Sequence, residues 1–257
     1  MAFRGIILDL DGTVYTGSKE VPGAAVFVHA CRAAGIRCLF VTNRTNRLPD
    51  AIAEHLCGYG IDCSGRDILT ASEATAALLP PGRAYVIGED GLEIPLRAAE
   101  FTLTDQDPDY VIVGFDRQFT YDKLRIACHW IGRGARFIAT NPDRALRMED
   151  RLYPGTGALV AAVEAGTNIR PLVIGKPGRP IMDMALKRLG MTAEQVLVVG
   201  DNLATDIPAA AAAGISSVLM LTGVSRAEDV AASPVAPTWV CATFAELETV
   251  VFGTGGA

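Results

Sequence analysis

Short apolar runs alternate with longer amphipathic segments along most of this chain. The runs are rich in Val and Ile and are bounded by Gly, Asp or Asn, which is typical of strands buried on both faces of a sheet. They occupy residues 5–10, 36–42, 84–88, 110–114, 135–140, 171–175, 195–200 and 215–221. With helices expected between them, the pattern predicts an α/β fold with a mainly parallel sheet.

Local helix signals support this interpretation. Thr120 stands where an N-cap is expected before the amphipathic segment that begins at residue 121, and Gly132 and Gly134 stand where that helix should stop. The alanine-rich stretch after residue 206 predicts another helix, which should end at Gly214.

Two turn-rich junctions divide the chain. PPGR at 80–83 and TNIRP at 167–171 enclose a block with its own alternation of strands and helices. We therefore expect an inserted domain at 81–170, and a core domain built from 1–80 together with 171–257.

Composition narrows the function classes. Half of the 257 residues are hydrophobic, so the chain can bury a sizeable core. The net charge of −6 argues against a nucleic-acid partner, because phosphate backbones are held mainly by Lys and Arg. No apolar stretch reaches membrane-spanning length and the cysteines form no CxxC pair, so we expect a cytoplasmic protein with no membrane segment and with reduced thiols.

Polar residues follow four of the predicted strands. In a parallel sheet the carboxyl ends of the strands form the ligand-binding edge, so we expect these side chains to converge. They are Asp9, Asp11, Thr42, Asn43, Lys176, Asp201, Asn202 and Asp206. Neighbouring carboxylates repel at neutral pH and need a cation, and an all-oxygen set suits Mg²⁺, the usual partner of phosphate groups.

The two acids of IILDLDGTVY suit different tasks. Asp9, at the strand end, could attack phosphorus and form an aspartyl-phosphate. Asp11 could protonate the leaving alkoxide and later accept a proton from water. Gly12 permits a tight turn, Thr13 could tie that turn with its hydroxyl, and Lys176 and Thr42 would complete a phosphate cradle.

The order of these motifs along the chain resembles that of a known superfamily. DLDGT at 9–13, Thr42, Lys176 and GDNLATD at 200–206 resemble, in order and context, the four motifs of the haloacid dehalogenase superfamily. Further segments resemble its subclass IIA, the NagD-like or 4-nitrophenylphosphatase-like phosphatases; they are VPGA, TNR, GFDR, TYDKL, FIATNPD, PGTGALVAAVE, GKP and LTGVS. The resemblance implies a Rossmann-like core with an inserted α/β cap of the C2 type, and a Mg²⁺-dependent phosphatase that hydrolyses a small phosphorylated metabolite. Resembling proteins often pair through their caps, which implies a homodimer.

The resemblance also implies a role for each site residue. Asp9 is the implied nucleophile, and the implied magnesium ligands are Asp9, the backbone carbonyl of Asp11, and Asp201. Thr42 and the backbone amide of Asn43 would hold the phosphoryl group, with Lys176 bridging it to Asp9. Asn202 and Asp206 would orient a metal-bound water and the lysine.

Two alternatives to hydrolysis stay open: phosphotransfer to a sugar acceptor, and a non-catalytic ligand-binding protein of the same fold. Asp11 favours phosphate chemistry over dehalogenation, because a halide leaves without a proton. Superfamily mutases usually carry a small helical cap between the first two motifs, and only residues 12–41 lie there. The intact acid/base beside a nucleophile counts against a pure binding role.

The roles of four further residues stay open. TNRTNR places Arg44 and Arg47 near the expected phosphate site, either as solvated arginines or as groups that reach a second part of the substrate. Some members that act on sugar phosphates resemble this chain there, which favours a sugar or polyol phosphate over a nucleotide, phosphoglycolate or pyridoxal phosphate. Asn141 and Asp143 follow a predicted strand and could form an ordinary turn or gate the substrate.

Overall fold

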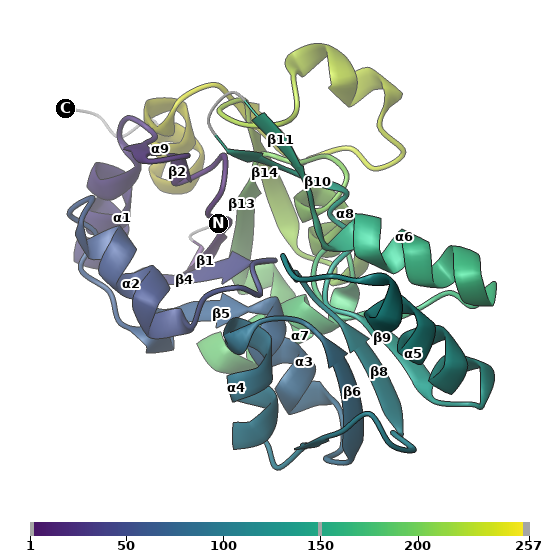
Figure 1. The fold of residues 1–257 in the computed structure, drawn as a ribbon. Coiled ribbons are helices and arrows are strands. Elements are labelled where there is room, and N and C mark those ends of the chain that lie inside the picture. The colour runs from purple at the N-terminus through teal and green to yellow at the C-terminus, as the bar shows by residue number, and fades with distance from the viewer. Residues whose placement is uncertain (1–2, 149–150, 254–257) are drawn as a thin grey trace. The chain divides into compact units, whose positions relative to one another are not determined.

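The computed structural model describes residues 3–148 and 151–253 (Figure 1). It divides into two compact units. The core unit comprises Met1–Thr42, Pro49–Leu69 and Pro177–Ala257, and the second unit comprises Asn43–Leu48 and Thr70–Lys176.

The core unit is built on a six-stranded sheet with the strand order β15-β14-β13-β1-β4-β5. The strands are β1 (Gly5–Leu8), β4 (Arg37–Thr42), β5 (Ile68–Thr70), β13 (Val196–Gly200), β14 (Ser216–Met220) and β15 (Trp239–Cys241). β1 lies between β13 and β4 and pairs with both in parallel, with Leu8 opposite Val199 and Phe40. A small hairpin, β2 (Tyr15–Thr16) and β3 (Lys19–Glu20), follows β1.

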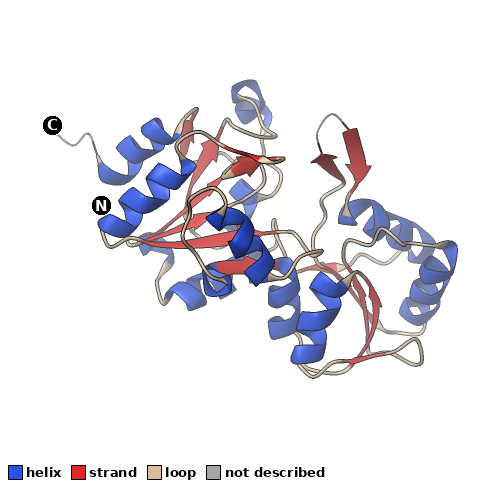
Figure 2. Ribbon diagram, turned by 60° about the vertical axis from the view of Figure 1, so that its left-hand side comes forward, coloured by secondary structure: helices blue, strands red, loops and turns tan. Residues whose placement is uncertain are grey.

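Helices accompany these strands, as the pattern of buried runs predicts (Figure 2). They are α1 (Ala24–Ala33), α2 (Pro49–Cys57), α7 (Arg179–Leu189), α8 (Asp206–Ala212) and α9 (Phe244–Phe252), with 3-10 turns η1 (Gly65–Asp67), η2 (Ala193–Gln195) and η3 (Ala227–Ala232). Alternate residues of β1 point to opposite faces, and both Ile6 and Ile7 are buried. Burial on both faces explains why the strands are continuously apolar.

The second unit has its own five-stranded parallel sheet, in the order β12-β9-β8-β6-β7. Its strands are β6 (Arg83–Ile87), β7 (Thr102–Leu103), β8 (Tyr110–Val113), β9 (Arg136–Ala139) and β12 (Leu172–Val173). Its helices are α3 (Ala71–Leu78), α4 (Asp90–Ala98), α5 (Tyr121–Gly132) and α6 (Thr156–Thr167), and β10 (Ala145–Met148) and β11 (Arg151–Pro154) form an antiparallel hairpin.

Helix boundaries follow the sequence signals. The Thr120 hydroxyl accepts a hydrogen bond from the Lys123 amide at 3.3 Å, so α5 starts at the predicted N-cap. Helix α8 ends at Ala212, and Gly214 adopts a φ of +71° as the chain leaves it.

One strand lies in a different sheet from the one expected. The sequence predicts that the run at 171–175 belongs to the core, whereas β12 pairs with β9 at the edge of the second sheet. Leu172 is 46% exposed there, which suits a short edge strand. Residues 43–48, 70–80 and 171–176 also belong to the second unit, because α3 packs on α4 and β12 packs on β9. The sequence predicts the domain boundaries at 80/81 and 170/171 instead.

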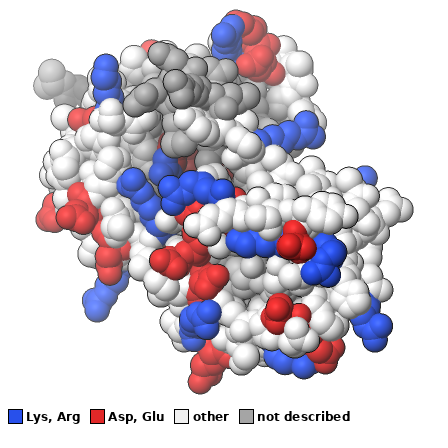
Figure 3. All heavy atoms as spheres, viewed as in Figure 1, with Lys and Arg blue, Asp and Glu red and all other residues white. Residues whose placement is uncertain are grey.

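Lys and Arg side chains are interspersed with Asp and Glu over the face shown in Figure 3. Within residues 3–148 and 151–253, no helix is both long enough and apolar enough to cross a bilayer.

Candidate active site

The turn that follows β1 presents Asp9 and Asp11 differently. The Asp9 amide donates to the Val199 carbonyl at 2.9 Å and so extends the β1–β13 ladder by one residue, with the side chain buried. The chain then reverses at Gly12, which has a φ of +90°, and the Gly12 amide donates to the Tyr15 carbonyl at 2.7 Å. Asp11 is exposed in this turn, and the Tyr15 hydroxyl donates to its Oδ2 at 3.4 Å.

Two further acids come from the β13–α8 connection. Asp201 follows Gly200, the last residue of β13, and its Oδ2 accepts a hydrogen bond from the Val224 amide at 2.6 Å. Asp206 opens α8, and its Oδ2 accepts from the Asn202 amide at 3.1 Å. These bonds hold both carboxylates in place, and each is 1% exposed.

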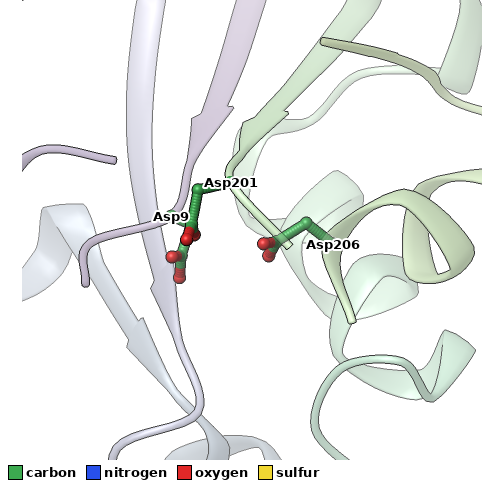
Figure 4. Close-up of side chains that lie close together, drawn as sticks. All are labelled: Asp9, Asp201 and Asp206. Atoms are coloured by element: carbon green, nitrogen blue, oxygen red, sulfur yellow. The ribbon is translucent and has the colours of Figure 1, made fainter. Parts of the chain in front are cut away.

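Asp9, Asp201 and Asp206 lie together at the carboxyl end of the core sheet (Figure 4). Each offers a carboxylate oxygen, and these three atoms lie within 4.8 Å of one another. The pairing of β1 with β13 accounts for the proximity of Asp9 and Asp201, since Leu8 lies opposite Val199. Buried carboxylates this close repel strongly without a cation, and an all-oxygen donor set fits a hard divalent ion such as Mg²⁺.

The composition of this cluster differs from the expected metal set. The family resemblance implies Asp9, Asp11 and Asp201 as ligands and an orienting role for Asp206. In the structure the Asp206 carboxylate joins the cluster, whereas the Asp11 side chain is exposed and does not. The expected Asp11 contact is a backbone carbonyl, so it stays a prediction.

Glycines leave room for these carboxylates. A Cβ on Gly12 would lie 2.4 Å from the Asp201 Oδ2, and a Cβ on Gly223 would lie 1.9 Å from the same atom. A Cβ on Gly200 would lie 2.3 Å from the Asp206 Cγ. Any side chain at these positions would displace a carboxylate of the cluster.

The loop 221–225 supports the cluster, a role that the sequence does not predict. The Thr222 hydroxyl donates to the Gly12 carbonyl at 2.6 Å and ties the loop to the turn after β1. The Ser225 amide donates to the Asp201 carbonyl at 3.1 Å. In the sequence, the segment LTGVS shows only a resemblance to the family. The position of Thr222 and Gly223 shortly after a buried strand is the local feature that could have indicated their role. The Thr13 hydroxyl, expected to tie the turn, is buried with no hydrogen-bond partner among the described residues.

In the second unit, Asn43 holds the backbone of Lys176. The Asn43 Oδ1 accepts from the Lys176 amide at 2.9 Å, and the Asn43 Nδ2 donates to the Lys176 carbonyl at 2.9 Å. One side-chain amide thus satisfies both backbone groups of the lysine. Lys176 is 3% exposed and follows the edge strand β12.

Asn141 and Asp143 belong to the same network. The Asn141 Nδ2 donates to the Asn43 carbonyl at 2.8 Å, and its Oδ1 accepts from the Asp143 amide at 3.1 Å. The Asp143 Oδ2 accepts from the Asn43 Nδ2 at 3.0 Å. Of the two readings left open, these contacts favour a structural role, in which Asn141 and Asp143 orient Asn43 and through it Lys176.

The segment after β4 is anchored by a residue that sequence reasoning missed. The Thr45 hydroxyl, buried, accepts a hydrogen bond from the Phe115 amide at 3.0 Å. A Cβ on Gly91, in the first turn of α4, would lie 2.5 Å from the Arg47 amide nitrogen, so the segment passes close to that turn. Thr42, the last residue of β4, is buried, Arg44 is half-buried and Arg47 is exposed.

Comparisons with known proteins agree with this architecture. A profile described as haloacid dehalogenase-like hydrolase matches residues 6–102, and one described as HAD-hydrolase-like matches 173–247. The 5′-nucleotidase YutF of Bacillus subtilis is 38% identical over 230 residues, covering 88% of this chain and 90% of the relative. The ribonucleotide monophosphatase NagD of Escherichia coli K12 is 36% identical over 253 residues, covering 97% of this chain and all of the relative. An acid sugar phosphatase of Staphylococcus aureus is 38% identical over 242 residues, covering 92% and 93%.

Solved structures give the same result. NagD from E. coli K-12 superposes with a TM-score of 0.90 at 37% identity, covering 96% of this chain and 98% of that one. A glycerol phosphate phosphatase from Mycobacterium tuberculosis, in complex with calcium, superposes with a TM-score of 0.88 at 34% identity, covering 95% and 74%. The predicted fold class and enzyme class are therefore confirmed. The chain belongs to the haloacid dehalogenase superfamily, in the NagD-like phosphatases of subclass IIA, and is a phosphoric monoester hydrolase.

Proposed function

We propose that this chain hydrolyses a small phosphorylated metabolite with Mg²⁺ as cofactor and with an aspartyl-phosphate on Asp9 as intermediate. The observation that carries the proposal is the buried cluster of Asp9, Asp201 and Asp206 at the carboxyl end of the core sheet. When bound, the cation would neutralise these carboxylates and polarise a phosphoryl oxygen. Asp9 and Asp201 would hold it together with the Asp11 carbonyl, and Asp206 would contribute directly or through water.

The chain's own groups would divide the chemistry in two steps. A carboxylate oxygen of Asp9 attacks phosphorus, the ester P–O bond breaks, and the Asp11 carboxyl gives its proton to the leaving alkoxide. Asp11, now a carboxylate, takes a proton from water as the water oxygen attacks phosphorus. The bond between phosphorus and Asp9 then breaks, which releases orthophosphate and restores the Asp9 carboxylate. Exposure of Asp11 supports this role, because its proton must be exchanged with the leaving group and with water.

Thr42, Asn43 and Lys176 would bind the phosphoryl group. The Thr42 hydroxyl and the backbone amide of Asn43 supply hydrogen-bond donors, and the Lys176 ammonium offsets the negative charge of the phosphoryl group. The double hydrogen bond from the Asn43 side chain supports a fixed position for Lys176. Asn202, whose amide holds the Asp206 carboxylate, would keep that acid oriented.

We propose a sugar or polyol phosphate as the substrate class. The relatives bear names that span nucleotides, acid sugar phosphates and glycerol phosphate, so fold alone does not select among them. Arg44 stands directly after the expected phosphate-binding residues, and its guanidinium could bind hydroxyls or a second anionic group. A panel of phosphorylated sugars, nucleotides, glycolate and pyridoxal phosphate, ranked by kcat/KM, tests this choice.

Mutants of the two N-terminal acids test the mechanism. With 4-nitrophenyl phosphate and Mg²⁺, Asp9→Asn should form no phosphoenzyme on acid quench and release no phosphate. Asp11→Asn should slow turnover by about 10²- to 10⁴-fold, the usual contribution of a general acid–base group, while calorimetric Mg²⁺ affinity stays close to wild type. Full activity of Asp9→Asn, or activity that is unaffected by EDTA, would refute the mechanism. Phosphorylated acceptor in place of orthophosphate would identify a phosphotransferase instead.

A further inference from the structure

A second charged site lies in the core unit, away from the carboxylate cluster. A hollow of about 290 Å³ opens beside the first residues of β4 and is lined by Arg32, Arg37, Arg66, Arg188 and Asp67, among others. We call it the arginine hollow. Arg37 is the first residue of β4 and Thr42, a proposed phosphate-binding residue, is the last. The length of the strand therefore places these two residues roughly 17 Å apart.

The guanidinium groups of the hollow are held mainly by uncharged acceptors. The Arg37 Nη1 donates to the Leu189 carbonyl at 2.7 Å, and the Arg188 Nη1 donates to the Ile68 carbonyl at 2.5 Å. Arg32 donates to the Asp62 carbonyl. A carbonyl fixes the orientation of a guanidinium but leaves its full positive charge in place.

Three of the four arginines in the hollow have no carboxylate partner among the described residues. Among the residues that the structure describes, Arg32, Arg37 and Arg66 take part in no ion pair. The one carboxylate of the lining, Asp67, already accepts from the Ser64 amide at 2.9 Å and the Ser64 hydroxyl at 3.1 Å. This concentration of positive charge occurs in a chain whose net charge is −6.

A purely structural explanation covers only part of the set. Arg37 satisfies carbonyls at the C-terminal end of α7, which is a common role for arginine. Arg66, on the turn η1, is exposed and makes no hydrogen bond or ion pair with any described residue. Each guanidinium has five N–H donors, so the bonds to carbonyls also leave donors on Arg32 and Arg37.

We propose that the arginine hollow binds a compact polyanion with two linked phosphate groups, such as pyrophosphate or the diphosphate of a nucleotide. Planar guanidinium groups match phosphate oxygens in pairs of hydrogen bonds, and several uncompensated arginines suit more than one phosphate. The volume suits a diphosphate better than a whole nucleotide, whose base would lie outside. The hollow is separate from the proposed catalytic residues, because the nucleophile Asp9 follows the other end of the neighbouring strand β1.

Binding of inorganic pyrophosphate to the full chain tests the proposal. Calorimetry in buffer with EDTA should show that Arg66→Gln weakens binding about tenfold, the factor expected for one charge-assisted hydrogen bond. Arg226→Gln removes the same charge from an exposed position elsewhere in the core unit and should leave affinity unchanged. Both variants should hydrolyse 4-nitrophenyl phosphate at the wild-type rate.

Chemical protection locates the ligand in the unaltered protein. Pyrophosphate should slow the phenylglyoxal modification of Arg37 and Arg66, mapped by peptide mass spectrometry, without protecting Arg226. Orthophosphate should protect them more weakly at equal concentration. Absence of protection, equal protection of Arg226, equal protection by orthophosphate, or an equal loss of affinity in the two variants would overturn the proposal.

Discussion

The contact between Asn43 and Lys176 allows a sharp test of how the lysine is positioned. Asn43→Asp changes one amide nitrogen to oxygen with almost no change in shape. The new oxygen would face the Lys176 carbonyl, now 2.9 Å from Nδ2, and the Asp143 Oδ2, now 3.0 Å from it. Two donated hydrogen bonds would become two repulsive contacts.

The expected loss of stability is about 2–4 kcal/mol. Each lost hydrogen bond accounts for about 1 kcal/mol. The rest comes from the unsatisfied Lys176 carbonyl and from the repulsion between the carboxylate introduced at position 43 and that of Asp143, both of which are partly solvated. For a chain of this size, the melting temperature should fall by roughly 2–4 °C for each kcal/mol. The rate of 4-nitrophenyl phosphate hydrolysis should also fall, by about tenfold or more, because Lys176 loses one of the two hydrogen bonds that hold its backbone and gains a repulsive contact in its place.

Exchanging the amide and the carboxylate between Asn43 and Asp143 distinguishes a local effect at this site from a general effect of added charge. Adding Asp143→Asn to Asn43→Asp recreates an amide–carboxylate pair with reversed roles, so part of the lost melting temperature should return. Asn46→Asp makes the same charge change at a half-buried position of the same segment and should cost little. Thermal unfolding followed by circular dichroism measures all four proteins. An unchanged melting temperature in Asn43→Asp would show that the contact does not hold Lys176, and no recovery in the double variant would show that the pair with Asp143 contributes nothing.

Two further outcomes are expected. Gly223→Ala places a methyl group 1.9 Å from the Asp201 Oδ2, so calorimetry should show Mg²⁺ affinity reduced at least tenfold, whereas Gly132→Ala, with no atom within 4 Å of the added carbon, should bind Mg²⁺ normally. The Arg117 side chain lowers the pKa of Glu89 below its ordinary 4.5, so this pair stabilises the fold above that pH and the contribution is lost as pH falls through the lowered value. Since Arg117 is 73% exposed, Glu89→Gln should cost no more than about 1 kcal/mol at pH 7, and the difference from wild type in thermal melts should vanish in acid. Persistence of the difference in acid would assign the effect to packing.

Local patterns in the sequence predicted much of this protein. Continuous apolar runs indicated strands buried on both faces, and β1, β4, β13 and β14 occupy those positions. Thr120 marked the start of α5 because an N-cap hydroxyl acts on an amide three residues away. The placement of Asp9 and Asp201 directly after strands was also visible, because it depends only on neighbours in the chain.

Tertiary structure decided what depends on pairing between distant segments. No local signal states which sheet a short apolar run joins, so β12 was assigned to the wrong one. The entry of Asp206 into the carboxylate cluster depends on how α8 leaves β13. The roles of Gly223, Thr222 and Asn43 arise from atoms that approach across long stretches of chain. Periodicity determines which face a residue occupies, whereas the packing of segments far apart in the sequence determines which side chains meet.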